Sequence, residues 1–171
     1  MIRTVERPQT CLCFVLRPGP GGRDEVLLGR KKRGLGAGKV VGLGGKVEPG
    51  EGAAQAAARE LAEESGLVAD PAELCPAAVV DWAFPARPAW DMWVTAFTTR
   101  DAVGEPRETA EIAPAWFPVG ALPLDAMWDD ARHWLPQVLA GRFLRGRIVF
   151  AEDCERVAET EIVLTDRPPA P

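Results

Sequence analysis

The stretch from Ala53 to Ser65 constrains the fold most, because it predicts one helix with a defined end. Its apolar residues recur at helical spacing and form a single stripe, made by Ala54, Ala57, Ala58 and Leu61. Gly66 follows where a left-handed glycine commonly ends a helix, and Leu67 then supplies the accompanying hydrophobic contact. The sequence therefore predicts a helix over residues 53–65, preceded by a glycine-rich loop over residues 31–46.

The rest of the chain predicts short strands and one late helix. Apolar runs bounded by turn residues indicate strands at residues 10–16, 26–28, 79–84, 92–98 and 115–119, and a closing hairpin of residues 148–151 and 161–165. A second helix is expected over residues 129–140, with Pro136 complicating its boundaries. This pattern predicts an α+β sandwich in one domain over residues 1–165, followed by a disordered tail over residues 166–171.

Composition excludes several classes of function. The net charge of −5 and the pI near 5.0 argue against a nucleic-acid polymer as partner, but allow a single nucleotide whose phosphates are met by metal ions. No run approaches the roughly 18 apolar residues of a membrane span, and the N-terminus has no signal-peptide core. Cys11 and Cys13 alternate with apolar residues in a strand and predict buried free thiols. These features predict a reduced cytoplasmic protein, either a monomer or a homodimer.

Three carboxylates gather at the end of the predicted helix. Glu60 lies about one turn from both Glu63 and Glu64, and like charges at this spacing destabilise a helix. The negative end of the helix dipole increases the cost. A cation would offset it, and oxygen ligands favour Mg²⁺ or Mn²⁺ over zinc. The alternative interpretation is a solvated acidic surface.

These carboxylates belong to a longer pattern. Gly45, Glu51 and the segment RELAEESGL at residues 59–67 stand at every defining position of the Nudix box, so the chain resembles the Nudix family. The resemblance implies an α/β/α Nudix sandwich with a mixed sheet and a catalytic loop–helix–loop. It also implies a divalent metal, Mg²⁺ with Mn²⁺ as substitute, and hydrolysis of a nucleoside diphosphate linked to another group.

Residue by residue, the resemblance implies a metal site on the helix and on the loop before it. Its oxygen ligands would be the Gly44 carbonyl and the carboxylates of Glu60, Glu63 and Glu64. Glu63 either binds the metal or positions water, Arg59 orients a glutamate, and Glu51 supports the metal shell. Such a site bridges phosphate oxygens and orients water for in-line displacement, which makes Glu63, Glu64 and Arg59 catalytic candidates.

Other segments are similar to the MutT-type hydrolases of oxidised purine nucleoside triphosphates. These are LLGRKKRGLGAGK before the box, and WFPVGALPLDAMW and HWLP near the C-terminus. Glu111, in ETAEIAPAWF, matches a distal glutamate that serves as a metal ligand or a base in many members of the family. The alternative for Glu111 is a surface charge beside Glu105 and Glu108.

The same similarity implies substrate-binding residues. Lys31 and Lys46 are candidates for the triphosphate, Trp128 for stacking on the base, and the pair Asp129 and Asp130 for hydrogen bonds to the base. The chain departs from the oxidised-purine pattern at Val41, which replaces an asparagine, at Ala131, which replaces an aspartate, and at Leu35, which replaces an aromatic residue. Lost polar contacts weaken discrimination between bases.

The expected function is that of a Mg²⁺-dependent pyrophosphohydrolase. It would release a nucleoside monophosphate and pyrophosphate from oxidised purine triphosphates such as 8-oxo-dGTP. One alternative is hydrolysis of a nucleotide sugar or a dinucleoside polyphosphate. A second alternative is a non-catalytic nucleotide sensor, for which loss of box glutamates is expected. A third is an interaction domain with an acidic surface helix.

Overall fold

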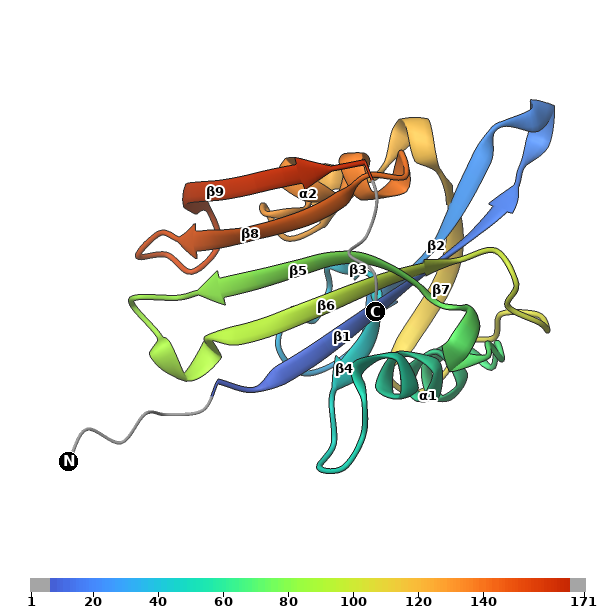
Figure 1. Cartoon of the computed structure of the whole chain (residues 1–171), viewed down its shortest axis with the longest axis horizontal. Coiled ribbons are helices and arrows are strands. Elements are labelled where there is room, and N and C mark those ends of the chain that lie inside the picture. Colours follow the sequence, from blue (N-terminus) through green and yellow to red (C-terminus); the bar gives the residue numbers. More distant parts are fainter. Residues whose placement is uncertain (1–6, 167–171) are drawn as a thin grey trace.

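The computed structural model describes residues 7–166, in which nine strands form one sheet (Figure 1). The main path through the sheet is β3-β2-β1-β6-β5-β8-β9, with β4 paired to β1 and β7 paired to β2. The strands are β1 (Gln9–Pro18), β2 (Asp24–Lys31), β3 (Val40–Val41), β4 (Leu43–Lys46), β5 (Cys75–Ala83), β6 (Met92–Thr99), β7 (Ile112–Pro118), β8 (Phe143–Phe150) and β9 (Val157–Thr165).

The sheet is mixed. β1 runs parallel to β6, and β5 runs parallel to β8, whereas the other pairs are antiparallel. Two helices, α1 (Ala53–Ser65) and α2 (Ala131–Leu139), accompany it. The predicted α+β sandwich with a mixed sheet is confirmed.

β1 divides the interior into two cores because its side chains alternate between the faces of the sheet. Cys11 and Cys13 join the core that contains the apolar stripe of α1. Phe14 joins the second core, in which Trp134 of α2 packs edge-on against it at a centroid distance of 5.8 Å. The central strand is therefore covered by α1 on one face and by α2 on the other.

The predicted first helix has the bounds that the structure shows. Gly66 ends α1 with φ of 79°, and its N–H donates to the Ala62 carbonyl over 2.9 Å. α2 begins at Ala131, two residues later than predicted, and Pro136 lies within it without ending it. The predicted closing hairpin is present as β8 and β9, and both strands are longer than expected.

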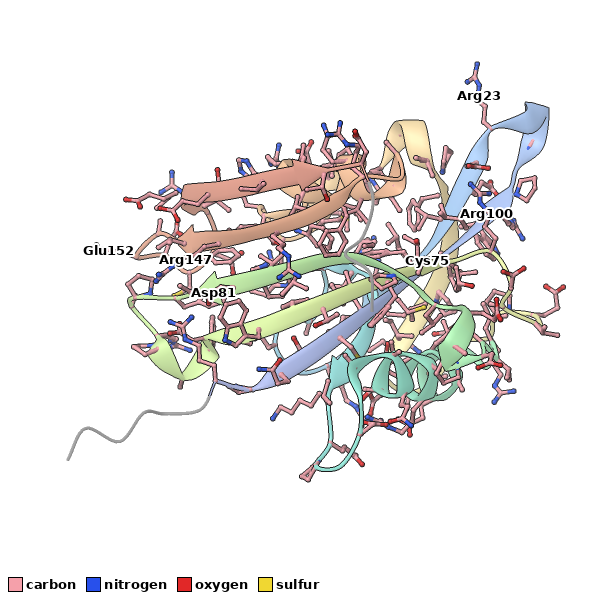
Figure 2. All side chains as sticks on the ribbon, in the orientation of Figure 1. Arg23, Cys75, Asp81, Arg100, Arg147 and Glu152 are labelled. Atoms are coloured by element: carbon pink, nitrogen blue, oxygen red, sulfur yellow. The ribbon has the colours of Figure 1, made fainter. Side chains whose placement is uncertain are left out.

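The cysteines are unpaired, as predicted for Cys11 and Cys13. Burial raises the pKa of the Cys11 thiol to about 11 and that of the Cys13 thiol to about 12, so both stay protonated near neutral pH. Cys154 is also buried, whereas Cys75 is exposed at the start of β5 (Figure 2).

An ion-pair group ties β5, β8 and the start of the described chain together. Asp81 of β5 pairs with Arg7 and, at 3.6 Å, with Arg147 of β8 (Figure 2). Of the tail predicted over residues 166–171, Asp166 alone is described, and its carboxylate lies 3.1 Å from the guanidinium of Arg142. The remainder, 167–171, lies outside the described residues. No helix within residues 7–166 has the length and apolar character that spanning a membrane requires.

Candidate active site

Strand β4, which precedes α1, approaches its neighbours closely because it contains two glycines, Gly44 and Gly45. Gly44 lies opposite Leu12 of β1, and a Cβ added to it would be 1.9 Å from the Cys11 carbonyl oxygen. A Cβ added to Gly45 would be 2.3 Å from Oε1 of Glu60. Gly44 thus lets β4 lie against β1, and Gly45 lets the Glu60 carboxylate of α1 contact β4.

The two glycines should respond differently to substitution. Gly44→Ala would clash with backbone, so we expect it to cost about 3 kcal/mol or more of unfolding free energy. Gly45→Ala would clash only with a side chain, so Glu60 turns away and the protein keeps most of its stability. Urea unfolding measures the difference, and equal losses in the two variants would contradict it.

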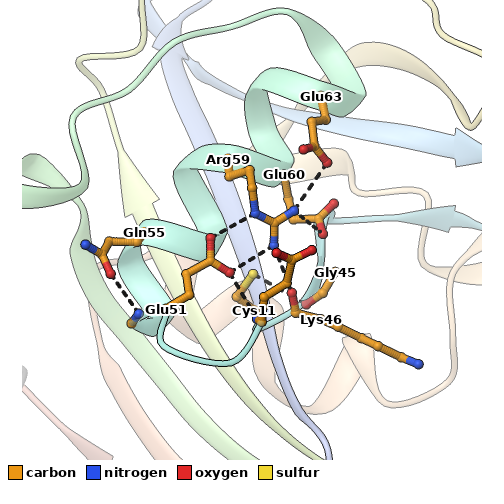
Figure 3. A network of polar contacts seen from close by, with 10 residues as sticks. Cys11, Gly45, Lys46, Glu51, Gln55, Arg59, Glu60 and Glu63 are labelled. Carbon is orange, nitrogen blue, oxygen red and sulfur yellow. Dashed lines mark hydrogen bonds and ion pairs between the residues drawn. The ribbon is translucent and has the colours of Figure 1, made fainter.

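The guanidinium of Arg59 contacts three carboxylates of the box, those of Glu51, Glu60 and Glu63 (Figure 3). Its Nε and Nη2 donate to the two oxygens of Glu51 over 2.8 and 3.0 Å, and Nη2 also donates to the Lys46 carbonyl over 3.0 Å. Its Nη1 donates to Glu60 over 3.0 Å and to Glu63 over 3.3 Å. The guanidinium therefore connects α1 with β4 and with Glu51, while the orienting role expected of Arg59 stays a prediction.

Burial sets the charge properties of these acids. Glu64 is 8% exposed, and burial raises its pKa to about 7, although the Gly44 N–H donates to its Oε2 over 2.9 Å. Burial also raises the pKa of Glu60, against the opposing effect of Arg59. Hydrogen bonds from Arg59 lower the pKa of Glu51. A cation would therefore be strongly favoured beside the carboxylates of Glu60 and Glu64.

The donor set fits a hard divalent cation. Besides burial, the charges of Glu60 and Glu111 raise the pKa of Glu64, and those of Glu63 and Glu111 raise the pKa of Glu60, as expected of ligand oxygens without their cation. Within residues 7–166, no three Asp, Glu, His or Cys side chains are already arranged to hold an ion. The ligand roles predicted for Gly44 and for these glutamates, with Glu63, therefore stay predictions.

The basic run before the box separates into two parts. Arg33 pairs with Glu111 over 2.6 Å, the Lys32 N–H donates to the Glu111 carbonyl over 2.9 Å, and the Lys32 ammonium pairs with Glu108. Lys31 instead lines the cavity described next. The structure thus ties two of these cations to the segment that carries Glu111 and leaves one for a ligand.

A cavity of about 280 Å³ connects the box to α2. Residues of the box, including Gly44, Lys46 and Glu64, line one part, and Lys31 lies among them. Aromatic side chains dominate elsewhere, namely Trp82, Phe84, Trp128, Trp134 and Phe150. An apolar pocket with few polar groups is the usual form of a small-molecule site.

Trp128 and Asp130 line this cavity as predicted, together with Leu35, Val41 and Ala131. Asp129 does not. Its carboxylate accepts the Val157 N–H over 2.8 Å and pairs with Arg132 over 2.8 Å. Of the predicted acidic pair, the structure therefore brings only Asp130 to the cavity.

Asp130 is buried beneath the cavity wall and 2% exposed. Trp134 donates from Nε1 to its Oδ2 over 2.8 Å. Burial nevertheless raises the pKa of the Asp130 carboxyl to about 6. This acid therefore changes charge near neutral pH, inside the cavity.

Asp130 should make stability depend on pH. Its folded-state pKa is raised, so between about pH 4 and pH 6 the folded protein keeps a proton that the unfolded chain releases. We expect the unfolding free energy of the wild type, relative to Asp130→Asn, to fall by about 3 kcal/mol as pH rises through this window. Urea unfolding at several pH values in EDTA measures it, and parallel curves would contradict it.

Trp128 is held in place by contacts from three segments. The Lys39 ammonium lies 4.8 Å from its ring centroid and pairs with Glu155 over 2.7 Å. A Cβ on Gly36 would be 2.8 Å from Nε1 of Trp128, so only glycine allows the loop to come this close. Phe150 packs edge-on at 6.2 Å. The indole is thereby fixed at the cavity wall.

Sequence reasoning missed three aromatic residues of the cavity, namely Trp82 of β5, Phe84 directly after β5, and Phe150 of β8. Alternation in residues 79–84 placed Trp82 and Phe84 on one side of a strand, but it did not say which core that side faces. The pairing of β5 with β8 decides this.

Comparison with known proteins identifies the fold and the box together. The model of the NUDIX domain matches residues 6–138. The chain belongs to the NUDIX family. It is 41% identical over 139 residues to an oxidized purine nucleoside triphosphate hydrolase of Danio rerio, covering 81% of this chain and 84% of that protein. A protein of the same name from Mus musculus is 38% identical over 141 residues, covering 82% of this chain and 85% of that protein.

Solved Nudix structures share the architecture. The mutator MutT protein of Bacillus halodurans superposes with a TM-score of 0.73 at 19% identity, covering 91% of this chain and 97% of that one. A MutT NUDIX hydrolase of Burkholderia pseudomallei gives a TM-score of 0.60 at 28% identity, with coverage of 69% and 88%. The predicted Nudix sandwich is confirmed.

Proposed function

We propose that this Nudix protein hydrolyses oxidised purine nucleoside triphosphates, such as 8-oxo-dGTP, to the nucleoside monophosphate and pyrophosphate. The observation that carries the proposal is that Glu64 of the box lines the same cavity as Trp128 and Asp130. A nucleotide bound in this cavity would have its phosphates near Glu64 and its base near the aromatic ring of Trp128. The names of the relatives from Danio rerio and Mus musculus support the substrate class.

In this proposal, Lys31 and Lys46 bind the triphosphate and Trp128 stacks on the base, while Asp130 hydrogen-bonds to it. Asp129 supports that wall from outside through the Val157 N–H. Buried donors and acceptors discriminate between bases better than apolar fit does. Val41 and Ala131 offer no side-chain hydrogen bond, and Asp129 points away from the cavity. In this proposal Asp130 therefore makes most of the hydrogen bonds to the base that were expected of the pair Asp129 and Asp130.

The reaction is hydrolysis of the α–β phosphoanhydride. Mg²⁺, with Mn²⁺ as substitute, would be held by Glu60, Glu63, Glu64 and Glu111 with the Gly44 carbonyl, and would supply charge compensation at the phosphate oxygens. In this proposal Glu63 and Glu64 orient water and accept its proton, with Glu111 as a further base candidate. Arg59 keeps Glu60 and Glu63 in position. Water adds to phosphorus, and the bridging P–O bond breaks.

Product analysis tests the reaction type. With 8-oxo-dGTP and Mg²⁺, we expect equal amounts of pyrophosphate and 8-oxo-dGMP, separated by anion exchange. Orthophosphate with the diphosphate would contradict this cleavage. Preferred turnover of a nucleotide sugar or a dinucleoside polyphosphate would favour the alternative substrates. Binding without turnover would favour a sensor, although Glu51, Glu60, Glu63 and Glu64 are all present.

The cellular setting is a further part of the proposal. Free buried thiols at Cys11 and Cys13 fit a reducing, cytoplasmic compartment. The substrate is a small nucleotide, and the proposal includes no nucleic-acid polymer or membrane partner. It applies equally to a monomer and to a homodimer.

A further inference from the structure

Trp82 is a cavity residue for which the proposed mechanism has no use. It lies on β5 opposite Met92 of β6 and Ile148 of β8. Its indole packs against the core beneath α2 and forms part of the cavity wall with Phe84. Its position therefore puts a large aromatic ring, with one polar atom, beside the proposed base.

The polar atom of Trp82 is unpaired. Its Nε1 is shielded from solvent and has no hydrogen-bond acceptor within the described part of the chain. Trp134 on the same cavity shows the usual arrangement, with its Nε1 donating to Asp130 over 2.8 Å. Native proteins pair nearly all buried donors, so an unpaired indole N–H on a residue that lines a ligand cavity suggests a partner from the ligand.

The polar side chains of the cavity wall leave this donor without a partner. Asp130 accepts from Trp134, and Glu64 accepts from the Gly44 N–H. Val41 and Ala131 present only apolar atoms. An indole N–H donates and never accepts, so its complement must be an acceptor atom.

We infer that Trp82 donates from Nε1 to an acceptor of the substrate base, a carbonyl oxygen or a ring nitrogen, and thereby determines which bases are accepted. The inference rests on the proposed function, because it assumes a nucleotide base in this cavity. Because Nε1 is shielded in this structure, the inference requires the indole to turn toward the base when the base binds. The resulting preference is for a base that presents an acceptor atom to Trp82 over one that presents a donor or a C–H there.

Trp82→Phe tests the inference because it removes the N–H and keeps an aromatic ring. We expect the Kd of 8-oxo-dGMP to rise about 3- to 10-fold, the worth of one neutral hydrogen bond. Removing the unpaired donor favours stability, but the smaller ring loses packing against the core, so the Tm is measured only to show that the variant is folded. Trp93→Phe is the matched control, since Trp93 is exposed, lies outside the cavity and should leave Kd unchanged.

Substrate analogues identify the acceptor. Comparing 8-oxo-dGMP with dGMP removes the 8-carbonyl and turns N7 from a donor into an acceptor, so comparing dGMP with 7-deaza-dGMP then isolates N7. Comparing 2′-deoxyinosine monophosphate with the purine deoxyriboside monophosphate removes the 6-carbonyl and the N1–H. The wild type should lose affinity in one of these pairs, and Trp82→Phe should not.

Equal loss of affinity by Trp82→Phe for every analogue, or no loss at all, would overturn the inference. These binding measurements need no turnover. If the wild type binds 8-oxo-dGMP but cleaves no triphosphate, the proposed function fails while the role of Trp82 is still decided. If it binds none of the nucleotides, both fail.

Discussion

Replacing Glu64 with glutamine should lower kcat by a factor of about 10²–10⁴ and leave the protein folded. The carboxylate lies in the cavity at the buried end of the box, where the proposal gives it a role in binding metal and in handling the proton of water. Glutamine keeps an oxygen that accepts the Gly44 N–H, so the loop geometry is preserved. It removes the negative charge, which the chemistry requires.

Initial rates with 8-oxo-dGTP measure the effect, and the Tm and far-UV circular dichroism show whether the fold is retained. Glu161→Gln is the matched control, because this residue lies on β9, outside the cavity, and should leave kcat unchanged. An active Glu64→Gln variant with a kcat within a factor of about three of the wild type would remove Glu64 from the mechanism.

Arg59→Met should reduce both stability and activity. The side chain makes five hydrogen bonds to four groups of the box, and methionine keeps the packing of the stem but makes none of them. Glu51 and Glu60 would then lack their guanidinium partner. We expect kcat/KM to fall about 10- to 100-fold, as for other residues that hold metal ligands in place.

The same variant should lower the Tm by about 5 °C or more, measured by differential scanning calorimetry. Arg156→Met is the matched control, because Arg156 pairs only near the surface with Asp153 and lies outside the cavity. Arg59→Lys keeps the charge but not the two-pronged contact with Glu51, so it should recover little activity. Wild-type activity in Arg59→Met would show that the contacts of Arg59 with the box glutamates are not needed for catalysis.

The box and its helix could be predicted in detail because their signals are local. The apolar stripe and Gly66 define α1 within residues 53–65, and the spacing from Gly45 to Leu67 carries the family resemblance. The same local reasoning could not separate Asp129 from Asp130. Helix α2 begins after them, and its first turn sends one carboxylate to the Val157 N–H and the other to the cavity.

Long-range contacts were beyond prediction. Arg33 and Glu111 are 78 positions apart, and only the pairing of β2 with β7 brings their segments together. Trp82 joins the cavity because β5 runs beside β8 over α2, an arrangement that no residue near Trp82 encodes. A resemblance also carries no information about residues outside its motifs, so the unpaired indole was visible only in three dimensions.

The most direct test of the account is pyrophosphate release from 8-oxo-dGTP and from dGTP by the wild-type protein, each with Mg²⁺ and with EDTA. We predict release that requires Mg²⁺ and a kcat/KM for 8-oxo-dGTP about 3- to 10-fold or more above that for dGTP, since one neutral hydrogen bond is worth about 3- to 10-fold. Equal rates for the two nucleotides would keep the hydrolase and reject the oxidised purine. Release that continues in EDTA, or no release from either nucleotide, would contradict the proposal of a Mg²⁺-dependent purine nucleoside triphosphate hydrolase.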